Sequence, residues 1–449
     1  MSTAQKSPLH TKIFIGMIVG IIAGLIIKQV GLAPETLDTI LQWVTPIGQI
    51  FLRMVFMTVI PLVFAALVLG IAEIGDLKRV GKIGMRLLMY SLVVSSISVF
   101  IGIALVNTFE PGNSLSSETR DYLTLQFQDK SASAGKNAEV AQGRTVGDII
   151  TNIVPKNPLS DMVRAFDADY SGGGLLAVMF FALVFGIAMA SVDAEKTSTL
   201  KSFFEGLYEV VIKIIGYAMQ LAPYGVAALL FNLTVSVGAS FLMVLLQYVL
   251  IVLAGLAIHQ FVTYSIILKY FANRNPIEFL RKSTEVILTA FSTSSSNATL
   301  PTAISVSIHK LKIPKPIANF VLTIGSTANQ NGTALFEGIT VLFLAQCFNV
   351  ELSLLSQVTV VFLCILAGIG TAGVPGGSLP VIVTILVSIG VPGEAIGLIY
   401  GVDRILDMSR TVLNVTGDIT AAAYIQRVEE KSADKQFAED RDSPDSYLN

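Results

Sequence analysis

The stretch LDMSRTVLNVTGD, residues 406–418, places charged and amide side chains inside an otherwise apolar segment. At 100° per residue in a helix, five polar side chains around this stretch fall within an arc of about 80°. They are Asp403, Asp407, Arg410, Asn414 and Asp418. An ionised side chain at the centre of a membrane helix costs about 2.5–3.5 kcal/mol, so we expect this stripe to face polar partners and not lipid. Its acids suit Na⁺, a proton or an ammonium group, and its guanidinium suits a carboxylate.

A purely structural interpretation of the stripe is the alternative. Asp407 and Arg410 are one helical turn apart and could pair with each other in a network that locks a bundle. The stripe nevertheless contains three acids and an amide against one base. This surplus of acids favours a ligand site over a self-contained ion-pair network.

A second polar interruption occurs in GSTANQNGTALFEG, residues 325–338, where Asn329, Gln330 and Asn331 directly precede Gly332. Glycine costs about 1 kcal/mol in a helix, and three consecutive amides are unusual in lipid. The pattern predicts an unwound turn whose carbonyls can hold a hard cation such as Na⁺, with a simple helix kink as the alternative. Glu337 follows this break, and a buried membrane glutamate could carry a proton.

The composition places these residues in a polytopic membrane protein. Only 14% of the 449 residues are charged, against about 25% in ordinary soluble domains, and the mean hydropathy is +0.70. The apolar run 13–27 has no convincing cleavage site and is predicted to be a retained first membrane helix. Further apolar segments can each cross the bilayer, for which about 20 helical residues suffice. They fall near 46–72, 84–108, 174–192, 205–235 and 239–269.

Basic residues predict the orientation of these helices. They cluster at 6–12, 78–86, 269–282 and 310–315, and counting helices puts these clusters on one side of the membrane. That side is expected to be the cytoplasm, together with both termini. The polar connection 109–170 then lies outside and is predicted to be a partly flexible linker. The charged tail that follows residue 428 is predicted to be disordered.

Several classes of protein are disfavoured by the composition. The net charge of −2 suggests no nucleic-acid partner, and the three histidines are scattered without an HExxH pattern, so no metalloenzyme is indicated. The serine run 294–296 has no histidine or lysine base nearby in the sequence, which argues against a nucleophilic enzyme. Cys347 and Cys364 lie in apolar segments and are expected to be buried thiols. We therefore expect neither enzymatic activity nor a cofactor.

Two segments of the last third share an unusual plan. Residues 283–309 have apolar arms around a Ser/Thr/Asn tip, and residues 354–390 have apolar arms around a Gly/Pro tip. Each arm is too short to span the membrane, and a longer apolar helix with polar residues follows each segment. Non-helical backbone at membrane depth persists only inside protein or beside a watery cavity. The repetition suggests an inverted repeat with a binding site at its broken helices, with two interfacial loops as the alternative.

Four motifs carry a family resemblance: STSSSNATLP, TANQNGTALFEG, GTAGVPGG and DRILDMSRTVLNVTGD. Together they resemble the dicarboxylate/amino acid:cation symporter family, which includes archaeal aspartate transporters, bacterial glutamate/aspartate symporters and mammalian excitatory amino acid transporters. The resemblance covers nearly the whole chain. It implies an all-α polytopic membrane protein with eight transmembrane helices, two re-entrant hairpins, inverted repeats and an elevator mechanism. It also implies a homotrimer in the bacterial cytoplasmic (inner) membrane.

The resemblance also implies how the chain is divided. Scaffold helices 1 and 2 would occupy 1–80, with helix 3 of the transport domain at 81–110 and the extracellular loop with the start of helix 4 at 111–172. Scaffold helices 4 and 5 would occupy 173–237, followed by the transport-domain core at 238–428 and a cytoplasmic tail at 429–449. Within the core the hairpins are expected at about 276–311 and 352–390.

The family's substrate-binding positions transfer to residues of this chain. By resemblance, Arg410 would bind the side-chain carboxylate of the substrate and Asp407 its α-amino group. Asn414 would bind the α-carboxylate together with the tip of the first hairpin. The remaining expected substrate residues are Ser295, Ser296 and Thr333, with Gly373 and Val374 of the second hairpin as a cover.

The family's cation positions transfer in the same way. One Na⁺ would be held by Asp418 with Gly325, Asn329 and Asn414, and another by Thr327 with carbonyls of the second hairpin. The family usually reads Asn-Met-Asp-Gly-Thr where this chain has residues 329–333, so Gln330 replaces a methionine and Asn331 an acid. Ser95 follows a valine where a Thr-Ser pair is usual. A third Na⁺ near Asn331 and Ser95 is therefore expected to be weakened or absent.

The resemblance finally suggests the transported compounds. Glu337 falls where the mammalian relatives place their proton-carrying glutamate, which suggests coupling to protons as well as, or in place of, Na⁺. Arg410 together with Asp407 implies L-aspartate or L-glutamate. C4-dicarboxylates are the alternative substrate, disfavoured because they bring no ammonium group to Asp407. A dedicated ion channel is a further alternative, but a pore would not need a carboxylate that matches an ammonium group.

Overall fold

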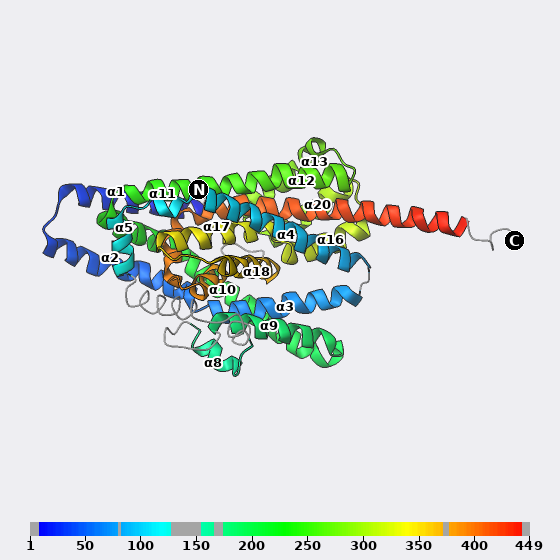
Figure 1. Ribbon diagram of the computed structural model, residues 1–449, viewed down its shortest axis with the longest axis horizontal. Helices are drawn as coiled ribbons and strands as arrows, with labels where there is room; N and C mark the ends of the chain where they lie inside the picture. Colours follow the sequence, from blue (N-terminus) through cyan, green and yellow to red (C-terminus); the bar gives the residue numbers. More distant parts are fainter. Residues whose placement is uncertain (1–8, 80–81, 127–153, 166–173, 371–376, 442–449) are drawn as a thin grey trace, which may run out of the picture.

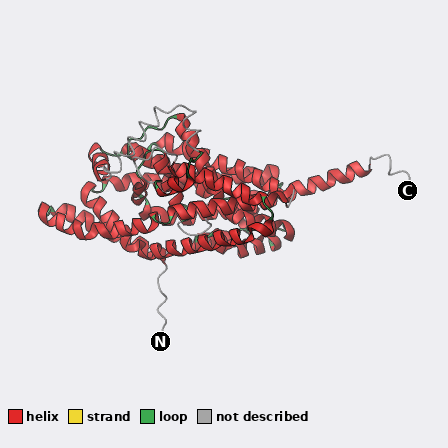
Figure 2. Ribbon diagram, turned by 90° about the horizontal axis from the view of Figure 1, so that it is seen from below, coloured by secondary structure: helices red, strands yellow, loops and turns green. Residues whose placement is uncertain are grey.

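The computed structural model describes residues 9–79, 82–126, 154–165, 174–370 and 377–441, and these residues form helices and their connections, without a strand among them. The helices assemble into an elongated bundle (Figures 1 and 2). The first half contains α1 (Leu9–Val30), α2 (Pro34–Phe56), α3 (Val59–Arg79), α4 (Lys82–Phe109), α9 (Gly174–Ser191), α10 (Ala194–Val237) and α11 (Ser240–Ile258). Short elements lie between α4 and α9, namely η1 (Pro111–Ser114), α5 (Ser117–Gln126) and α8 (Pro158–Val163).

The second half consists of shorter helices around one long one. After α11 the helix continues through π-helical turns as η2 (His259–Thr263), α12 (Tyr264–Ile266) and η3 (Ile267–Phe271). The next elements are α13 (Pro276–Lys282), α14 (Thr284–Thr293), α15 (Ser296–His309), α16 (Lys315–Ala328) and α17 (Asn331–Cys347). The chain ends with α18 (Leu354–Gly370), α19 (Leu379–Ser388), η4 (Gly393–Leu398) and α20 (Tyr400–Arg441).

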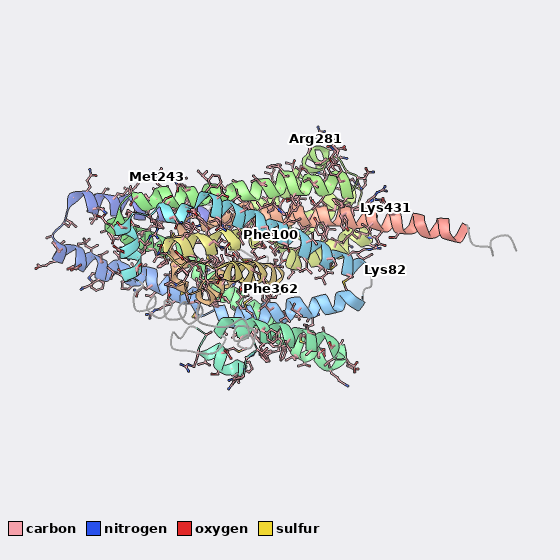
Figure 3. The ribbon with its side chains drawn as sticks, viewed as in Figure 1. Lys82, Phe100, Met243, Arg281, Phe362 and Lys431 are labelled. Atoms are coloured by element: carbon pink, nitrogen blue, oxygen red, sulfur yellow. The ribbon has the colours of Figure 1, made fainter. Side chains whose placement is uncertain are left out.

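Five stretches of the described chain are long and apolar enough to cross a membrane. They are Thr11–Val30, Pro34–Ala72, Lys82–Ser114, Ala194–Ser236 and Ser240–Phe271, and shorter apolar helices occur at Ala177–Ser191, Ser356–Leu366 and Leu379–Ser388. The flanks of the bundle expose large apolar side chains such as Phe100, Met243 and Phe362, whereas exposed charged residues such as Lys82, Arg281 and Lys431 lie toward the end from which α20 projects (Figure 3). This division is expected for helices surrounded by lipid.

Close contact between α1 and α10 depends on small residues. A Cβ atom added at Gly20 would lie 2.9 Å from the Cα atom of Ala227, a distance that real Cβ contacts do not reach. The two backbones therefore touch directly, as small residues permit between membrane helices. α10 packs in turn against α2 and α3.

Two short helices lie in the segment where the first hairpin is predicted. α14 and α15 pack against each other, and the chain reverses at Ser294, whose φ of 50° is left-handed. Both arms lie against α20. In the second hairpin α18 and α19 both pack against α17, while the tip at 371–376, with Gly373 and Val374, lies outside the described residues.

The predicted break in the preceding helix is confirmed. α16 ends at Ala328 and α17 begins at Asn331, because Asn329 and Gln330 leave the helical conformation with ψ values of 57° and 59°. Residues 331–345 of α17 are all buried. The break therefore places non-helical backbone in the interior of the protein and not at its surface.

One expectation about a segment outside the core is corrected. The tail was expected to be disordered after residue 428, but α20 continues as a helix of 42 residues to Arg441 and projects from the bundle (Figure 1). The physical reason is composition, because residues 418–441 contain neither glycine nor proline and are rich in good helix formers. Within the connection at 109–170, the described residues include the short elements η1, α5 and α8.

Candidate functional site

The polar stripe of α20 faces the interior, as its periodicity predicted. Its members are 2–4% exposed: Asp403, Asp407, Arg410, Asn414 and Asp418. α20 is contacted by α14 and α15 of the first hairpin and by α16 and α17 on either side of the break. The stripe is thus enclosed by the same broken elements that the sequence singled out.

Arg410 joins the two acids at the beginning of the stripe. Its Nη1 atom lies 3.0 Å from Asp403 Oδ1, and its Nη2 atom lies 2.9 Å from Asp407 Oδ1. The guanidinium also stacks over the Phe336 ring at 4.2 Å from the ring centroid. A buried arginine is therefore compensated twice by charge and once by a π face. The internal pairing that formed the structural alternative is present, with one nitrogen of the guanidinium on each of the two carboxylates.

A second arginine lies beside the same carboxylate. Arg404 Nη1 is 3.5 Å from Asp407 Oδ2, and the Arg404 side chain is 15% exposed. Asp407 thus lies between two guanidinium groups, one on each carboxylate oxygen. The sequence analysis did not identify Arg404, although its separation of three residues from Asp407 is a spacing at which helical side chains meet.

Asn414 connects α20 to the beginning of α17. Its Oδ1 atom accepts hydrogen bonds from the backbone N–H groups of Gly332 at 2.7 Å and Thr333 at 3.4 Å. Its Nδ2 atom donates to Thr333 Oγ1 at 3.1 Å and to Gln330 Oε1. A Cβ atom at Gly332 would lie 2.6 Å from the carbonyl oxygen of Arg410, so only glycine permits this approach of the two helices. Asn414 and Thr333, expected to share a substrate, are therefore in direct contact.

Asp418 and Asn329 form an oxygen-rich corner deeper in the protein. Asn329 Nδ2 donates to Asp418 Oδ1 at 2.9 Å, while the Oδ1 atom of Asn329 is buried and accepts no hydrogen bond from the described residues. A Cβ atom at Gly325 would lie 2.7 Å from Asp418 Oδ1, so the backbone of α16 passes close to this carboxylate. A carboxylate, a spare amide oxygen and nearby carbonyls are the donors that a hard cation such as Na⁺ prefers. Thr327, expected at a second Na⁺, is half-buried at the end of α16.

Asn331 has its hydrogen-bonding groups filled by protein. Its Oδ1 atom accepts from Ser95 Oγ at 2.7 Å, its Nδ2 atom donates to the Tyr264 hydroxyl at 3.0 Å, and its carbonyl accepts from Ser98 Oγ at 2.9 Å. Tyr264 in turn donates to the carbonyl of Leu413 at 3.1 Å. The predicted proximity of Asn331 and Ser95 is confirmed. Sequence reasoning missed Ser98 and Tyr264, and for Tyr264 no local signal exists, because it lies 67 positions from its partner.

Glu337 lies in α17, one turn beyond Thr333, and is 0% exposed. It belongs to the part of α17 that is buried on all sides. A glutamate in such a position is the kind of residue that membrane transporters use to carry protons.

The tip of the first hairpin is closed by its own hydrogen bonds. Ser295 caps α15 by accepting from the backbone N–H of Ala298 at 3.2 Å, and Thr299 Oγ1 donates to the Ser295 carbonyl at 2.8 Å. Ser296 begins α15 and is 3% exposed, and the buried Ser294 hydroxyl has no hydrogen-bond partner in the part of the chain that the structure describes. The N-terminus of α15 therefore brings backbone N–H groups and hydroxyls to the inner end of the hairpin, which suits a carboxylate.

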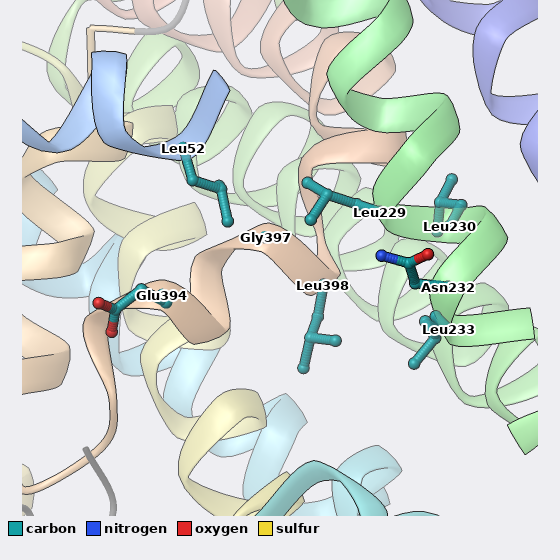
Figure 4. Close-up of a pocket in the computed structure, with 8 residues that line it drawn as sticks. All are labelled: Leu52, Leu229, Leu230, Asn232, Leu233, Glu394, Gly397 and Leu398. Atoms are coloured by element: carbon teal, nitrogen blue, oxygen red, sulfur yellow. The ribbon is translucent and has the colours of Figure 1, made fainter. Parts of the chain in front are cut away.

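A pocket elsewhere in the protein does not coincide with this site. It lies between α2, α10 and η4 (Figure 4). Its lining is mostly leucine, with Asn232 and Glu394 as polar members, and it includes no residue of the polar stripe.

Comparison with known proteins identifies a family for this chain. Residues 9–428 match the profile of the Sodium:dicarboxylate symporter family. The proton/sodium-glutamate symport protein of Bacillus subtilis is 36% identical over 426 residues, which cover 94% of this chain and 93% of that protein. The proton/glutamate-aspartate symporter of Escherichia coli is 30% identical over 427 residues, covering 95% and 94%. The C4-dicarboxylate transport protein of B. subtilis is 31% identical over 424 residues, covering 94% and 93%.

Proposed function

This chain belongs to the sodium:dicarboxylate symporter family, and we propose that it is a secondary active symporter of L-aspartate and L-glutamate driven by Na⁺, H⁺ or both. The observation that carries the proposal is the buried arrangement of Arg410 with Asp403 and Asp407. A fixed cation beside a fixed anion matches an acidic amino acid, because the cation can bind its side-chain carboxylate and the anion its α-ammonium group. The names of the relatives, a glutamate symporter and a glutamate-aspartate symporter, support the same substrate class.

Substrate binding would replace ion pairs within the protein by contacts between the protein and the substrate. Arg410 would pass from Asp407 to the side-chain carboxylate of the substrate while it keeps Asp403, and Asp407 would receive the α-ammonium group. The α-carboxylate would bind to Asn414 and to the hairpin tip at Ser295 and Ser296. This exchange of partners suits transport, because the buried charges stay compensated both with and without bound substrate. The protein therefore avoids the high cost of an isolated buried ion.

Thr333 is supported as a substrate residue by its hydrogen bond to Asn414. Gly373 and Val374 are proposed as the cover of the site on the family resemblance alone, because they lie outside the described residues. A hairpin that closes over the substrate would exclude water and strengthen each polar contact.

Cation binding is proposed at Asp418. The spare amide oxygen of Asn329 beside that carboxylate supports a Na⁺ site, with Gly325 and Asn414 as backbone neighbours. Thr327 and carbonyls of the second hairpin are proposed for another Na⁺. The relatives' names include both sodium and proton coupling, so the coupling ion is left to experiment.

We propose that the third Na⁺ site of the family is lost here. Asn331 carries no charge, and Ser95 and Tyr264 already use its amide. A proton on Glu337 is the proposed replacement as a coupling ion. The full burial of Glu337 supports this role, because moving such a group between faces of the membrane with its charge neutralised lowers the cost of transport.

The proposed architecture has eight membrane helices and two re-entrant hairpins, with the N- and C-termini in the cytoplasm of a bacterium. Long helices α1, α2 and α10, which pack together, would belong to the scaffold of a homotrimer. The transport domain would contain α4, α11 and the elements from α13 to α20, and it would move as an elevator. The apolar stretches and the hairpin at Ser294 support this assignment.

Transport by purified protein in sealed vesicles tests the proposal. We expect labelled aspartate and glutamate to accumulate against their gradients when an inward Na⁺ or H⁺ gradient is imposed. Titration calorimetry with aspartate, glutamate and succinate, each with and without Na⁺, identifies the substrate and the binding cation. Conductance without accumulation would favour a channel, and succinate binding as tightly as aspartate would favour the C4-dicarboxylate alternative suggested by the third relative.

A further inference from the structure

We propose that α13, together with the end of the helix before it and the loop at residues 310–315, forms a binding surface for anionic phospholipid at one face of the membrane. The headgroups of the lipid would meet exposed basic side chains, and its acyl chains would meet exposed apolar ones. This surface lies apart from the polar stripe of α20, and lipid binding there does not depend on which solute the protein transports.

α13 follows closely after a stretch that can span a membrane. The stretch Ser240–Phe271 is long and apolar enough to cross a bilayer, and only residues 272–275 separate it from α13. A connection of this length reaches at most about 18 Å, so α13 stays close to the boundary between lipid and water. Tyr270, which is 69% exposed, is the kind of aromatic side chain that occupies this boundary.

The outward face of α13 combines an apolar side chain with a base. Phe279 is 4% exposed and therefore marks the inner face of this helix. At 100° per residue, the direction opposite Phe279 lies between Ile277 and Arg281, which are one turn apart. Ile277 is 81% exposed, and Arg281 is exposed at the outer edge of the bundle (Figure 3). An interfacial helix meets acyl chains and anionic headgroups with this combination of side chains.

Basic residues outnumber acids around α13. Residues 269–285 contain four bases and two acids, and residues 310–315 contain three bases and no acid. The two segments adjoin, because Arg274 Nη1 donates a hydrogen bond to the carbonyl of Leu311 at 3.1 Å. Seven bases against two acids give this surface a clear positive charge.

The acids do not neutralise the remaining bases. Each acid already pairs with one base at 2.7 Å, Glu278 with Lys282 and Glu285 with Lys310. Arg281 and Lys312 are exposed and form no ion pair with any residue that the structure describes. The phosphate groups of an anionic leaflet are the complementary charge, and each base near such a surface adds to the attraction.

Bases at this face would also set the orientation of the helices, and that role alone is the competing explanation. Orientation requires no apolar side chain beside the bases. Here the apolar surface continues from α13 onto the flank of the preceding helix, where Phe271 and Phe261 are 57% and 63% exposed. This continuity with a lipid-facing flank favours contact with the leaflet itself.

A tryptophan reporter tests the surface, because the chain contains a single tryptophan, Trp43. In a Trp43→Phe background, Ile277→Trp places the sole indole on α13, and Leu250→Trp places it in the middle of α11 as the matched control. Ile277 and Leu250 are 81% and 56% exposed, so neither change removes a buried side chain. Full-length protein is reconstituted in mixed vesicles of phosphatidylcholine and phosphatidylglycerol, with bromine on the acyl chains of one lipid at a time, and quenching of the indole fluorescence is measured.

We expect brominated phosphatidylglycerol to quench the Ile277→Trp reporter at least about twofold more than brominated phosphatidylcholine at equal lipid fractions. Adding Arg281→Gln and Lys312→Gln should remove this preference. Salt at about 1 M should remove it as well, because the screening length falls from about 10 Å to about 3 Å. The Leu250→Trp reporter should be quenched equally by the two lipids in every condition.

Each contrary result overturns the proposal in a different way. Equal quenching of the Ile277→Trp reporter by the two lipids would leave the bases with the role of setting orientation alone. No quenching by either lipid would place α13 in water. A preference that survives the loss of Arg281 and Lys312 would show that these bases do not bind the headgroups.

Discussion

Arg410 is anchored to Asp403, seven residues earlier on the same helix, by a buried contact of 3.0 Å between Nη1 and Oδ1. Two turns of α20 therefore act as one rigid support for the guanidinium. Asp407, between them, holds the other nitrogen at 2.9 Å. The substrate exchange proposed above would leave Asp403 as the permanent partner of Arg410 and Asp407 as the one that the substrate replaces.

The variant Asp403→Asn tests which acid is permanent. An asparagine can still accept the hydrogen bond, but the buried guanidinium loses half of its charge compensation. We expect the ligand-free protein to lose about 2 kcal/mol of stability, and bound aspartate to restore most of it by supplying a carboxylate. Thermal unfolding with and without aspartate measures this difference. Equal destabilisation in both conditions would show that Asp403 does not support the substrate-binding arginine.

The variant Asn331→Asp tests the lost cation site. An acid at this position would keep the Ser95 donor and add the charge that a third Na⁺ requires. We expect aspartate affinity to depend more steeply on Na⁺ concentration than in the unsubstituted protein, because binding of one more cation would be linked to substrate binding.

Calorimetric titrations of aspartate over a series of Na⁺ concentrations provide the slope for Asn331→Asp. The control is Asn331→Ala, which removes the amide and its hydrogen bond to Tyr264 without adding charge. A slope equally shallow in both variants would mean that Asn331 is not the residue that excludes the third Na⁺.

The variant Glu337→Gln tests proton coupling. Glutamine keeps the size and polarity of this fully buried side chain but cannot carry a proton. If Glu337 carries the proton inward, uptake by unsubstituted protein rises as the external pH falls, and the rise disappears in the variant. Labelled aspartate uptake into vesicles, measured against external pH at constant Na⁺, provides the profile. Identical profiles for the two proteins would exclude Glu337 as the carrier.

Periodicity predicted the parts of the site that lie on one element. The stripe from Asp403 to Asp418 shares a face because helix geometry alone fixes it, and the break at Asn329 follows from the local cost of glycine and consecutive amides. Contacts between distant elements could not be predicted in this way. The bond from Asn331 to Tyr264 joins residues far apart in sequence, and only the packing of α12 against α17 and α20 determines it.

Helical spacing and helix propensity explain two features of α20 that its charges alone do not predict. Arg404 precedes Asp407 by three residues, a spacing at which helical side chains meet, and its Nη1 atom lies 3.5 Å from Asp407 Oδ2. The charge of the segment after residue 428 predicts disorder, but its residues are good helix formers and the helix continues to Arg441.

The variant Gly332→Ala tests the close approach of α17 to α20. The added Cβ atom would lie 2.6 Å from the Arg410 carbonyl oxygen and 3.0 Å from Asn414 Oδ1, and a backbone atom cannot move aside as a flexible side chain can. We expect a loss of about 1–3 kcal/mol of stability, as for other overpacked cores, together with at least a tenfold loss of aspartate affinity. Gly338→Ala is the matched control, because the same addition in the same helix makes only ordinary van der Waals contacts, the nearest with Val99 Cγ1 at 3.4 Å and Ile103 Cγ1 at 3.7 Å. Chemical denaturation and calorimetry on both variants supply the two readouts, and equal effects at the two positions would show that the spacing between Gly332 and Arg410 does not shape the site.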